Sequence, residues 1–336
     1  MKIARFFLLC SVLFFSTGLM AQKAMPAKKQ GVYEFVAQKI QGDFDEVATA
    51  ISEAVQQNGW DVVAVVDAGT PEGCEYRARV FVLYDSTYAE TLLQANRRTA
   101  PYALLDRVTL FEDENGLNLS IVNTVSINRT VMMDDEKFDA LSAEHKEALR
   151  TALSGAVTGE SSDRQYGQVR KKGYIGKTMG VMAGGKFSDQ LEDIMTISGG
   201  SLDGTVGQVR SAFQGTGASW GIHMAYEVPL PAHNMTLFGV TGTPMDSKSF
   251  SIVGAGADKM RKNFKCPGIA HAAAYPIEVV VAQNGDDVVV TVPYVMYRMK
   301  MYFEDAGKWA FMKNMTMPGS IQDEITEMVK TAVAGK

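Results

Sequence analysis

The sequence contains few of the residues that build metal sites and disulfide networks. Its 336 residues include three cysteines and four histidines, and no two cysteines form a Cys-x-x-Cys pair. This excludes a zinc knuckle, a thioredoxin-type site and a small disulfide-stabilised domain. A bond between Cys74 and Cys266 and two separate buried thiols both stay open, and we favour the separate thiols.

Positive charge is also scarce. The chain has 33 lysines and arginines against 38 aspartates and glutamates. The first 21 residues contain Lys2 and Arg5 but no acidic residue, so a chain without them has 31 basic and 38 acidic residues and a net charge of −7. No basic stripe of the kind that follows a phosphate backbone is present, and we expect no nucleic-acid partner.

Long apolar runs are missing except at the N-terminus. Residues 6–15 are almost wholly apolar, follow the two basic residues and precede the small Ser16-Thr17-Gly18. This is the layout of a secretory signal peptide, and the run is shorter than the ~20 apolar residues that span a bilayer. We expect cleavage within residues 18–21 and a soluble, exported, periplasmic protein without a transmembrane segment.

The second half of the chain repeats the pattern of the first. In each half a tryptophan begins an apolar stretch that ends in an acidic residue, and an Asn-Gly pair precedes an arginine and a methionine at the same internal spacings. Such self-similarity predicts two similarly folded units. The matching positions are Trp60 and Trp220, Asp67 and Glu227, Asn115-Gly116 and Asn284-Gly285, Arg129 and Arg298, and Met132 and Met301.

Strand and helix patterns alternate in the first unit, residues 30–155. A capping box of Asp43 and Glu46 begins one helix, which Asn58-Gly59 ends, and Asp85 begins a second helix. The pair Asn115-Gly116 predicts a hairpin. This order predicts a two-layer α+β unit with a mainly antiparallel sheet and helices on one face. The predicted strands are 32–40, 60–66 as a central strand, 75–84, 107–111 and 117–125, and a last helix runs from Phe138 to Leu153.

The second unit, residues 191–334, follows the same plan less regularly. Residues 156–190, rich in glycine and lysine, are predicted to be a linker, and residues near 229–248 to be an insertion. The predicted strands are 194–197, 220–228, 250–253, 277–281 and 288–292, and the predicted helices are 206–213, 258–264 and 321–333.

The first unit resembles the domain-of-unknown-function 302 family. The resemblance rests on the helix that ends in Gly59-Trp60, the strand to Asp67, the strand and helix of residues 80–93, and the hairpin at Asn115-Gly116. It covers about residues 32–155, and a more divergent second copy covers about residues 195–333. It implies a two-layer α/β fold without an assigned activity. The cysteine that the family often has before the hairpin is absent here, so the resemblance implies no reactive thiol.

One short motif suggests catalysis. Residues 217–221 read Gly-Ala-Ser-Trp-Gly, which matches the G-x-S-x-G pattern of a hydrolase nucleophile elbow. That elbow requires a strand before the serine and a helix after it, and here the predicted order is reversed. We therefore expect a helix-to-strand turn, and keep an esterase-like hydrolase through Ser219 as the alternative function.

The repeated polar residues are candidates for ligand binding. Arg129 and Arg298 could together hold a carboxylate or a phosphate between the two units. Asp67 and Glu227, at the ends of matching strands, are the second pair. The structural interpretation of the arginines, which we favour, is that each caps a strand end or pairs with an acidic neighbour such as Asp134 or Glu304. For Asp67 and Glu227 it is a role in a turn or cap.

Methionine is abundant, with 19 residues, and thioether sulfur suits Cu(I). Met299 and Met301 would share a strand face, and Cys266 and His271 are a second candidate pair of metal ligands. Adaptable core packing explains methionines equally well, and we favour packing. His145 is expected to be exposed on a helix.

The sequence thus predicts two tandem α+β domains and no cofactor. We expect a non-catalytic ligand-binding or structural protein of the cell envelope rather than an enzyme. Its partner would be a small molecule or an envelope component, held in the crevice between the two units.

Overall fold

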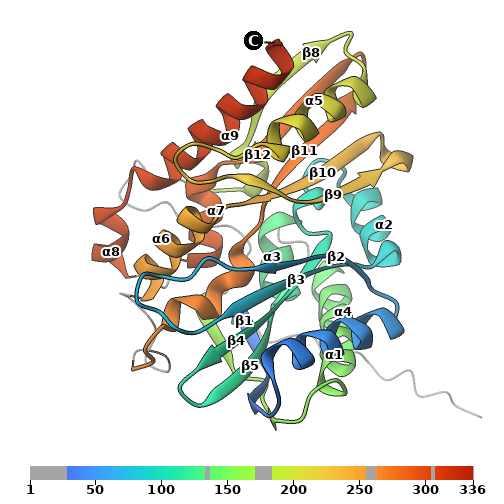
Figure 1. Ribbon diagram of the computed structural model, residues 1–336. Coiled ribbons are helices and arrows are strands. Elements are labelled where there is room, and N and C mark those ends of the chain that lie inside the picture. Colours follow the sequence, from blue (N-terminus) through green and yellow to red (C-terminus); the bar gives the residue numbers. More distant parts are fainter. Residues whose placement is uncertain are drawn as a thin grey trace, which may run out of the picture.

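The computed structural model describes residues 29–132, 137–170, 184–254, 261, 263–303 and 307–335. The predicted signal peptide, residues 1–21, lies outside this range. The described residues form two antiparallel sheets with helices, stacked one above the other (Figure 1). The protein therefore has the α+β class that the sequence predicts. None of its described helices combines the length and the apolar character needed to cross a bilayer.

The first half is built on a sheet in which five strands follow the order β2-β3-β4-β5-β1. Two short strands, β6 and β7, extend this sheet by pairing with β1. Its elements are β1 (Gln30–Ile40), α1 (Phe44–Gln57), β2 (Asp61–Asp67), β3 (Ala78–Tyr84), α2 (Ser86–Ala95), η1 (Ala100–Tyr102), β4 (Leu105–Asp113), β5 (Gly116–Val122), α3 (Thr124–Val131), α4 (Lys137–Ser154), β6 (Glu160–Ser161) and β7 (Gln165–Arg170).

The second half is built on a sheet with the order β9-β10-β11-β12-β8. When its strands are matched to those of the first half in chain order, the two sheets have the same topology, as the repeated sequence pattern predicts. Its elements are η2 (Phe187–Gln190), β8 (Leu191–Ser198), α5 (Leu202–Gln214), β9 (His223–Leu230), η3 (Pro231–His233), β10 (Met235–Thr241), α6 (Thr243–Gly254), η4 (Pro267–Ala274), β11 (Ile277–Asn284), β12 (Asp287–Pro293), α7 (Val295–Phe303), α8 (Lys308–Lys313) and α9 (Met317–Ala334).

Local sequence signals explain where several elements begin and end. The Asp43 carboxylate accepts hydrogen bonds from the backbone N–H groups of Asp45 and Glu46, at 2.8 and 3.2 Å, and so satisfies two free donors at the start of α1. Asp85 does the same for α2. After α1 the chain turns at Gly59, whose φ of +96° is costly for a residue with a side chain.

Both predicted hairpins are present. Asp113 pairs with Gly116 between β4 and β5, and Asn284 pairs with Asp287 between β11 and β12, so each connection has two residues. Gly285, the first residue of the second connection, has a positive φ angle, as a tight two-residue turn requires. Gly116, which also has a positive φ angle, is the first residue of β5, directly after the first connection.

The third strand of the second half differs from the prediction. Residues 250–253 lie in α6, where Phe250 and Val253 are fully buried on one helical face, and the strand is β10. The segment predicted as an insertion, residues 229–248, therefore contains a regular strand of the sheet. Gly239 obscured its pattern: a Cβ atom there would lie 2.1 Å from the ring of Tyr226 on β9, so the close packing of these strands requires glycine.

Four further predictions need correction. Strand 60–66 is not central: β2 is an edge strand of the sheet, and it appears apolar on both faces because it also lies against β9 of the other half (Figure 1). The strand predicted over 117–125 ends at Val122, and α3 follows. Residues 156–190 include β6 and β7. Of the helix predicted over 258–264, residues 258–260 and 262 lie outside the described part of the chain, and the second helix of this half is α6.

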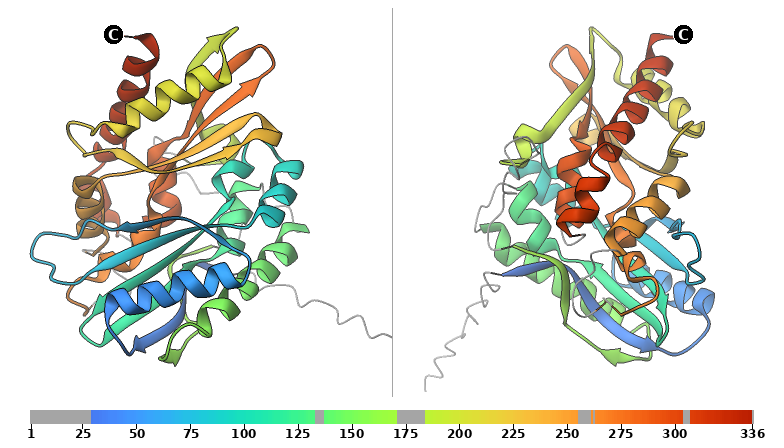
Figure 2. Two further views of the ribbon diagram at one scale, coloured as in Figure 1. Left: turned by 45° about the vertical axis from the view of Figure 1, so that its right-hand side comes forward. Right: turned by 90° about the vertical axis from the view of Figure 1, so that its left-hand side faces the viewer.

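Two cores stabilise the molecule. The smaller core lies between the outer face of the first sheet and helices α1 and α4. The larger core starts on the inner face of the first sheet and continues through the whole second half, whose outer face is covered by α5 and α9 (Figure 2). Because one core belongs to both halves, they form a single folded body.

Each half covers the inner sheet face of the other with the segment that follows its second helix. In the second half this segment is η4, which packs on β3, β4 and β5 of the first sheet. In the first half it is η1, where the Tyr102 hydroxyl donates to the carbonyl of Thr291 on β12 at 3.3 Å. Each connection therefore reaches across to the sheet of the other half, and we call this arrangement the reciprocal crossover.

Candidate functional site: a cleft between the two halves

The centre of the interface is a buried cluster of charges rather than an open site. Arg107 of β4 donates to the carboxylate of Glu278 on β11, and Arg298 of α7 donates to the same carboxylate at 2.9 Å. These side chains are at most 4% exposed. The ring of Tyr302 lies under both guanidinium groups, 5.3 Å from that of Arg107 and 4.8 Å from that of Arg298. Burial lowers the pKa of Arg298.

The structure does not bring Arg298 and Arg129 to a common ligand site. Arg129 lies on α3, is 8% exposed, and donates through Nε and Nη2 to the carboxylate of Asp139 on α4, at 2.6–3.2 Å. Arg298 is bound by Glu278 and by the carbonyl groups of Ala274 and Pro276. Both arginines lie on helices, and both are held by carboxylates of the chain itself.

Asp67 and Glu227 also have partners within the chain. Asp67, at the end of β2, accepts from Nε and Nη2 of Arg79 at 2.6 and 3.1 Å. Glu227 on β9 accepts from Arg210 on α5, with both distances 2.6 Å. The predicted crevice residues therefore form ion pairs within single halves or in the buried interface, and none of them lines the cleft described next.

An open cleft lies elsewhere along the interface. It has a volume of about 260 Å³ and is bounded on one side by the connection between α2 and β4 and on the other by the inner face of β10, β11 and β12. The side chains of Met235, Val280, Ala282 and Val289 form its apolar floor. Its rim is formed by Arg97, Arg98, Pro101, Tyr102, Asn284 and Thr291.

The unequal lengths of the two crossover connections explain this cleft. Between α6 and β11 the chain has 22 residues, including the eight-residue η4, which fills the inner face of the first sheet. Between α2 and β4 it has nine residues, of which only Ala100–Tyr102 form a helical turn. The shorter connection leaves part of the inner face of the second sheet uncovered.

The two arginines at the rim have different roles. Arg97 donates from Nη2 to the carbonyls of His233 and Gln283, at 2.7 and 2.9 Å, and thereby ties the first half to the second. Arg98 is half-exposed, and its guanidinium lies 3.7 Å from the carboxylate of Asp193 on β8. Such a loose, solvent-exposed pair contributes little stability and leaves the cation accessible.

Tyr102 supplies a further polar group of the cleft wall, with its hydroxyl donating to the carbonyl of Thr291. Burial raises the pKa of this phenol well above its usual range, so the side chain is a neutral hydrogen-bond donor at any physiological pH. An apolar floor with one accessible cation and a few neutral polar groups suits a small amphipathic molecule with an anionic or hydrogen-bond-accepting end.

A larger hollow, of about 730 Å³, lies between α5 and α9 on the outer surface of the second half. It is a shallow groove lined mainly by small residues, among them Gly204, Gly207, Ala212 and Gly215. It lacks a converging set of charged and aromatic side chains, and we therefore take the cleft between the halves as the candidate site.

The loop around Ser219 has a structural role. It connects α5 to β9, in the helix-to-strand order predicted from the sequence. Glu324 of α9 accepts hydrogen bonds from the backbone N–H groups of Ser219, at 2.8 Å, and of Trp220, at 3.0 Å. A Cβ atom at Gly217 would lie 2.0 Å from the Glu324 carboxylate, so a side chain there would displace this carboxylate. The nearby His223 turns its Nδ1 atom to the carbonyl of Gly221.

The candidate metal ligands are not assembled. Met299 and Met301 lie on helix α7 rather than on a strand, and both are buried in the core. His271 is buried, with its Nδ1 atom 3.1 Å from Arg261. Among the described residues, no group of three or more histidine, cysteine or acidic side chains is placed to hold a metal ion.

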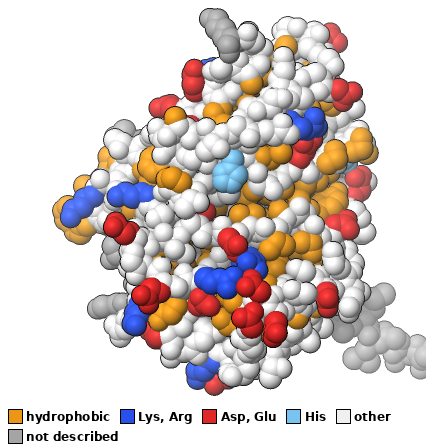
Figure 3. Space-filling view, viewed as in Figure 1, with side chains coloured by type: hydrophobic (Ala, Val, Ile, Leu, Met, Phe, Trp, Pro, Cys, Tyr) orange, Lys and Arg blue, Asp and Glu red, His pale blue; other side chains and the backbone are white. Residues whose placement is uncertain are grey.

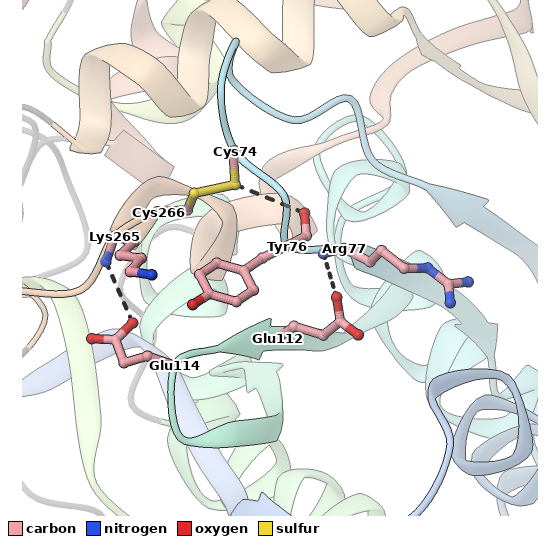
Figure 4. The surroundings of a disulfide bond; sticks show 7 residues. All are labelled: Cys74, Tyr76, Arg77, Glu112, Glu114, Lys265 and Cys266. Carbon is pink, nitrogen blue, oxygen red and sulfur yellow. Dashed lines mark hydrogen bonds between the residues drawn. A yellow bond between two sulfur atoms is a disulfide. The ribbon is translucent and has the colours of Figure 1, made fainter.

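Cys266 forms a disulfide with Cys74, which corrects our expectation of two separate thiols. Figure 4 shows the bond between the loop that follows β2 and the start of η4, with Glu112 and Glu114 of the first half nearby. It joins residues 192 positions apart and covalently ties the two halves together.

His145 is buried rather than exposed. Its Nε2 atom lies 2.7 Å from the Asp106 carboxylate, which also accepts from the indole of Trp60, and its ring stacks on Tyr88. Burial lowers the pKa of His145, but the charge and hydrogen bond of Asp106, together with the charge of Asp85, outweigh this and raise the pKa above its ordinary value. The exposed charges beside His145 on α4 concealed its buried position.

No motif in the sequence marks Arg97, Arg98 and Tyr102 as site residues. The sequence carries one signal for this cleft. The segment between the second helix and the hairpin has far fewer residues in the first unit than in the second unit. This difference in length indicates a cleft only once it is known that each segment covers the sheet of the other half.

Comparison with known proteins finds a partial structural similarity. No protein-family model and no curated protein sequence matches the chain. A solved structure described as an uncharacterized conserved protein DUF302 from Bacillus stearothermophilus is similar at 14% identity, over 36% of this chain and 95% of that chain, with a TM-score of 0.32.

Proposed function

We propose that this chain is an exported, non-catalytic binding protein of the cell envelope, and that it holds a small amphipathic molecule in the cleft between its halves. The observation that supports this proposal is the part of the second sheet's inner face that the short connection after α2 leaves uncovered. An apolar surface inside a fold otherwise closed by reciprocal packing is a natural place for a ligand.

The chemistry of the rim supports an anionic end group on the ligand. Among the described residues Arg98 makes one loose ion pair, with Asp193, and its guanidinium can exchange that carboxylate for one on a ligand. The neighbouring Arg97 is committed to two carbonyl groups and keeps the rim in place. The floor of methionine, valine and alanine side chains would contact the apolar body of the ligand.

Anilinonaphthalene sulfonate, which has an aromatic body and a sulfonate, is a suitable probe. We expect one saturable site with increased fluorescence on the folded protein lacking residues 1–21. Ala282→Trp, which fills the floor, should remove binding. Arg98→Gln should weaken it about tenfold, because a hydrogen bond to a charged group is lost.

Arg77→Gln is the matched control, because Arg77 is a comparably exposed arginine outside the cleft, paired with Asp45. Circular dichroism and a denaturation midpoint verify that each variant is folded. If Ala282→Trp and Arg98→Gln bind the probe as the original protein does, the cleft is not the binding site and the proposal fails. Mass spectrometry of molecules retained by protein from its native compartment would then identify the ligand class.

A further inference from the structure

Helix α8 has no counterpart in the described part of the first half. There, α3 ends at Val131 and α4 begins at Lys137. In the second half α7 ends at Phe303 and α9 begins at Met317, and α8 lies in the longer connection between them. The fold of the first half is complete without such an element, so the topology alone does not require α8.

This added helix carries the most exposed large apolar side chain among the described residues. Trp309 is 74% exposed and Met315, just after the helix, is 42% exposed, whereas Trp60 is 6% exposed. Exposing a tryptophan to water is unfavourable, and exposed apolar groups that lie together mark contact sites for membranes or proteins.

The other side of α8 is anchored. Phe311 packs against the large core and lines a small apolar cavity beside Ile252 of α6. The N–H group of Phe311 donates to the carbonyl of Gly307, and the Asn314 side chain to the carbonyl of Ala310. The helix thus has a fixed inner face and presents Trp309 outward. In Figure 1, α8 lies at the left edge of the molecule.

Two exposed lysines lie on or beside this apolar helix. Residues 307–322 contain two lysines and no acidic residue, although the chain as a whole is acidic. Lys313 at the end of α8 is exposed, and so is Lys248 on α6, which packs against α8. Figure 3 shows basic and hydrophobic side chains together at the left edge, where α8 lies, with an acidic side chain just below them. Glu304 and Asp305 precede the helix and lie outside the described residues.

We propose that α8 is a membrane-contact site that docks this protein reversibly on an anionic lipid surface. Trp309 and Met315 enter the headgroup region, and Lys313 and Lys248 face the lipid phosphates. Tryptophan suits this depth because its ring is apolar while its N–H group can still find a polar partner. Exposed apolar side chains beside lysines are typical of peripheral membrane contacts, and the net negative charge elsewhere on the chain orients α8 toward the bilayer.

Vesicle binding tests this proposal. Protein without residues 1–21 is mixed with vesicles of phosphatidylglycerol and phosphatidylethanolamine, and with vesicles of phosphatidylcholine alone, and the bound fraction is measured by flotation. We expect binding to the anionic vesicles, a blue shift of tryptophan fluorescence, and weakening by salt. Trp309→Ser should lower the partition coefficient about tenfold and abolish the shift. Lys313→Gln should lower it about fivefold.

Two control variants make the result specific to α8. Val65→Ser removes another exposed apolar side chain, on β2, and should bind vesicles as the original protein does. Arg98→Gln removes an exposed cation near α2, on the far side of the molecule from α8, and should also leave vesicle binding unchanged while it impairs the cleft (Figure 1). Failure of the cleft and failure of the membrane site are therefore distinguished.

Three outcomes would overturn the proposal. The first is that the original protein does not float with anionic vesicles. The second is that Trp309→Ser and Val65→Ser bind equally. The third is that a photocrosslinker at position 309 captures a protein while the lipid assay stays negative, which would assign α8 to a protein partner instead.

Discussion

Arg107 on β4 of the first half donates to Glu278 on β11, the matching strand of the second half, and both side chains are almost completely buried. The same carboxylate also neutralises Arg298. A single acidic side chain thus compensates two buried cations, one from each half.

We predict that Glu278→Gln lowers the free energy of unfolding by about 3–5 kcal/mol, because two buried guanidinium groups lose the carboxylate that binds both of them. Urea denaturation measures the change. The matched control is Glu227→Gln, whose partner Arg210 is largely exposed and whose loss should cost at most about 1 kcal/mol. Equal effects of the two variants would show that the cluster is not central to stability.

The disulfide should stabilise the folded protein. We expect Cys74→Ser, or reduction of the bond, to lower the free energy of unfolding by about 2–4 kcal/mol, because the bond closes a long loop and limits the unfolded chain. Intact mass after alkylation provides the direct measurement in protein lacking residues 1–21. Two alkyl groups should be added only after reduction, and alkylation without reductant would refute the bond.

The buried carboxyl group of Asp246 should make the stability of the folded protein decrease as the pH rises. Burial raises its pKa from 3.8 to about 7, although its carboxylate accepts from the N–H group of Gly69 and the hydroxyl of Thr241. Between these values the folded protein holds a proton that the unfolded chain releases. The stabilisation is therefore complete below the unfolded pKa of 3.8 and is lost as the pH rises through about 7.

Asp246→Asn should remove this dependence. Between about pH 5 and pH 8 the stability of the original protein should fall relative to the variant, with a slope of at most about 1.4 kcal/mol per pH unit. Urea denaturation across this range provides the comparison, which cancels the titration of groups common to both proteins. A stability difference that does not change with pH would contradict the raised pKa.

Glu324 should contribute more to the stability of the folded protein than Ser219 does. Glu324→Ala removes the acceptor of several backbone N–H groups in the 217–222 loop and should cost about 1–3 kcal/mol, because these donors lose their partner. Ser219→Ala should change stability by no more than about 0.5 kcal/mol and should leave any hydrolysis of p-nitrophenyl esters unchanged. An esterase activity that Ser219→Ala abolishes would restore the hydrolase interpretation.

The sequence predicted those parts of the fold that depend on local signals. Helix caps such as Asp43 and Asp85 and the Asn-Gly pairs act within a few residues, so the helices and hairpins that they begin were predicted correctly. The strand order common to both sheets agrees with the repeated positions.

The errors came from contacts made by the rest of the chain. β10 was missed because Gly239, which interrupts its pattern, exists to admit the ring of Tyr226 from the neighbouring strand. β2 was predicted to be central because contact with β9 of the other half gives an edge strand an apolar sequence on both faces. The cleft depends on the packing of one half on the other, which spacing within either half does not encode.

The continuous apolar interior that passes from the first sheet into the second half has a consequence for dissection of the chain. A fragment that stops near residue 170 would expose the apolar inner face of the first sheet to water. The guanidinium of Arg107 would also lose its carboxylate acceptor, Glu278. The nearest surface of matching shape would be the same sheet in another fragment molecule. Truncation at the midpoint is therefore expected to give self-associating or insoluble material rather than an independent monomer.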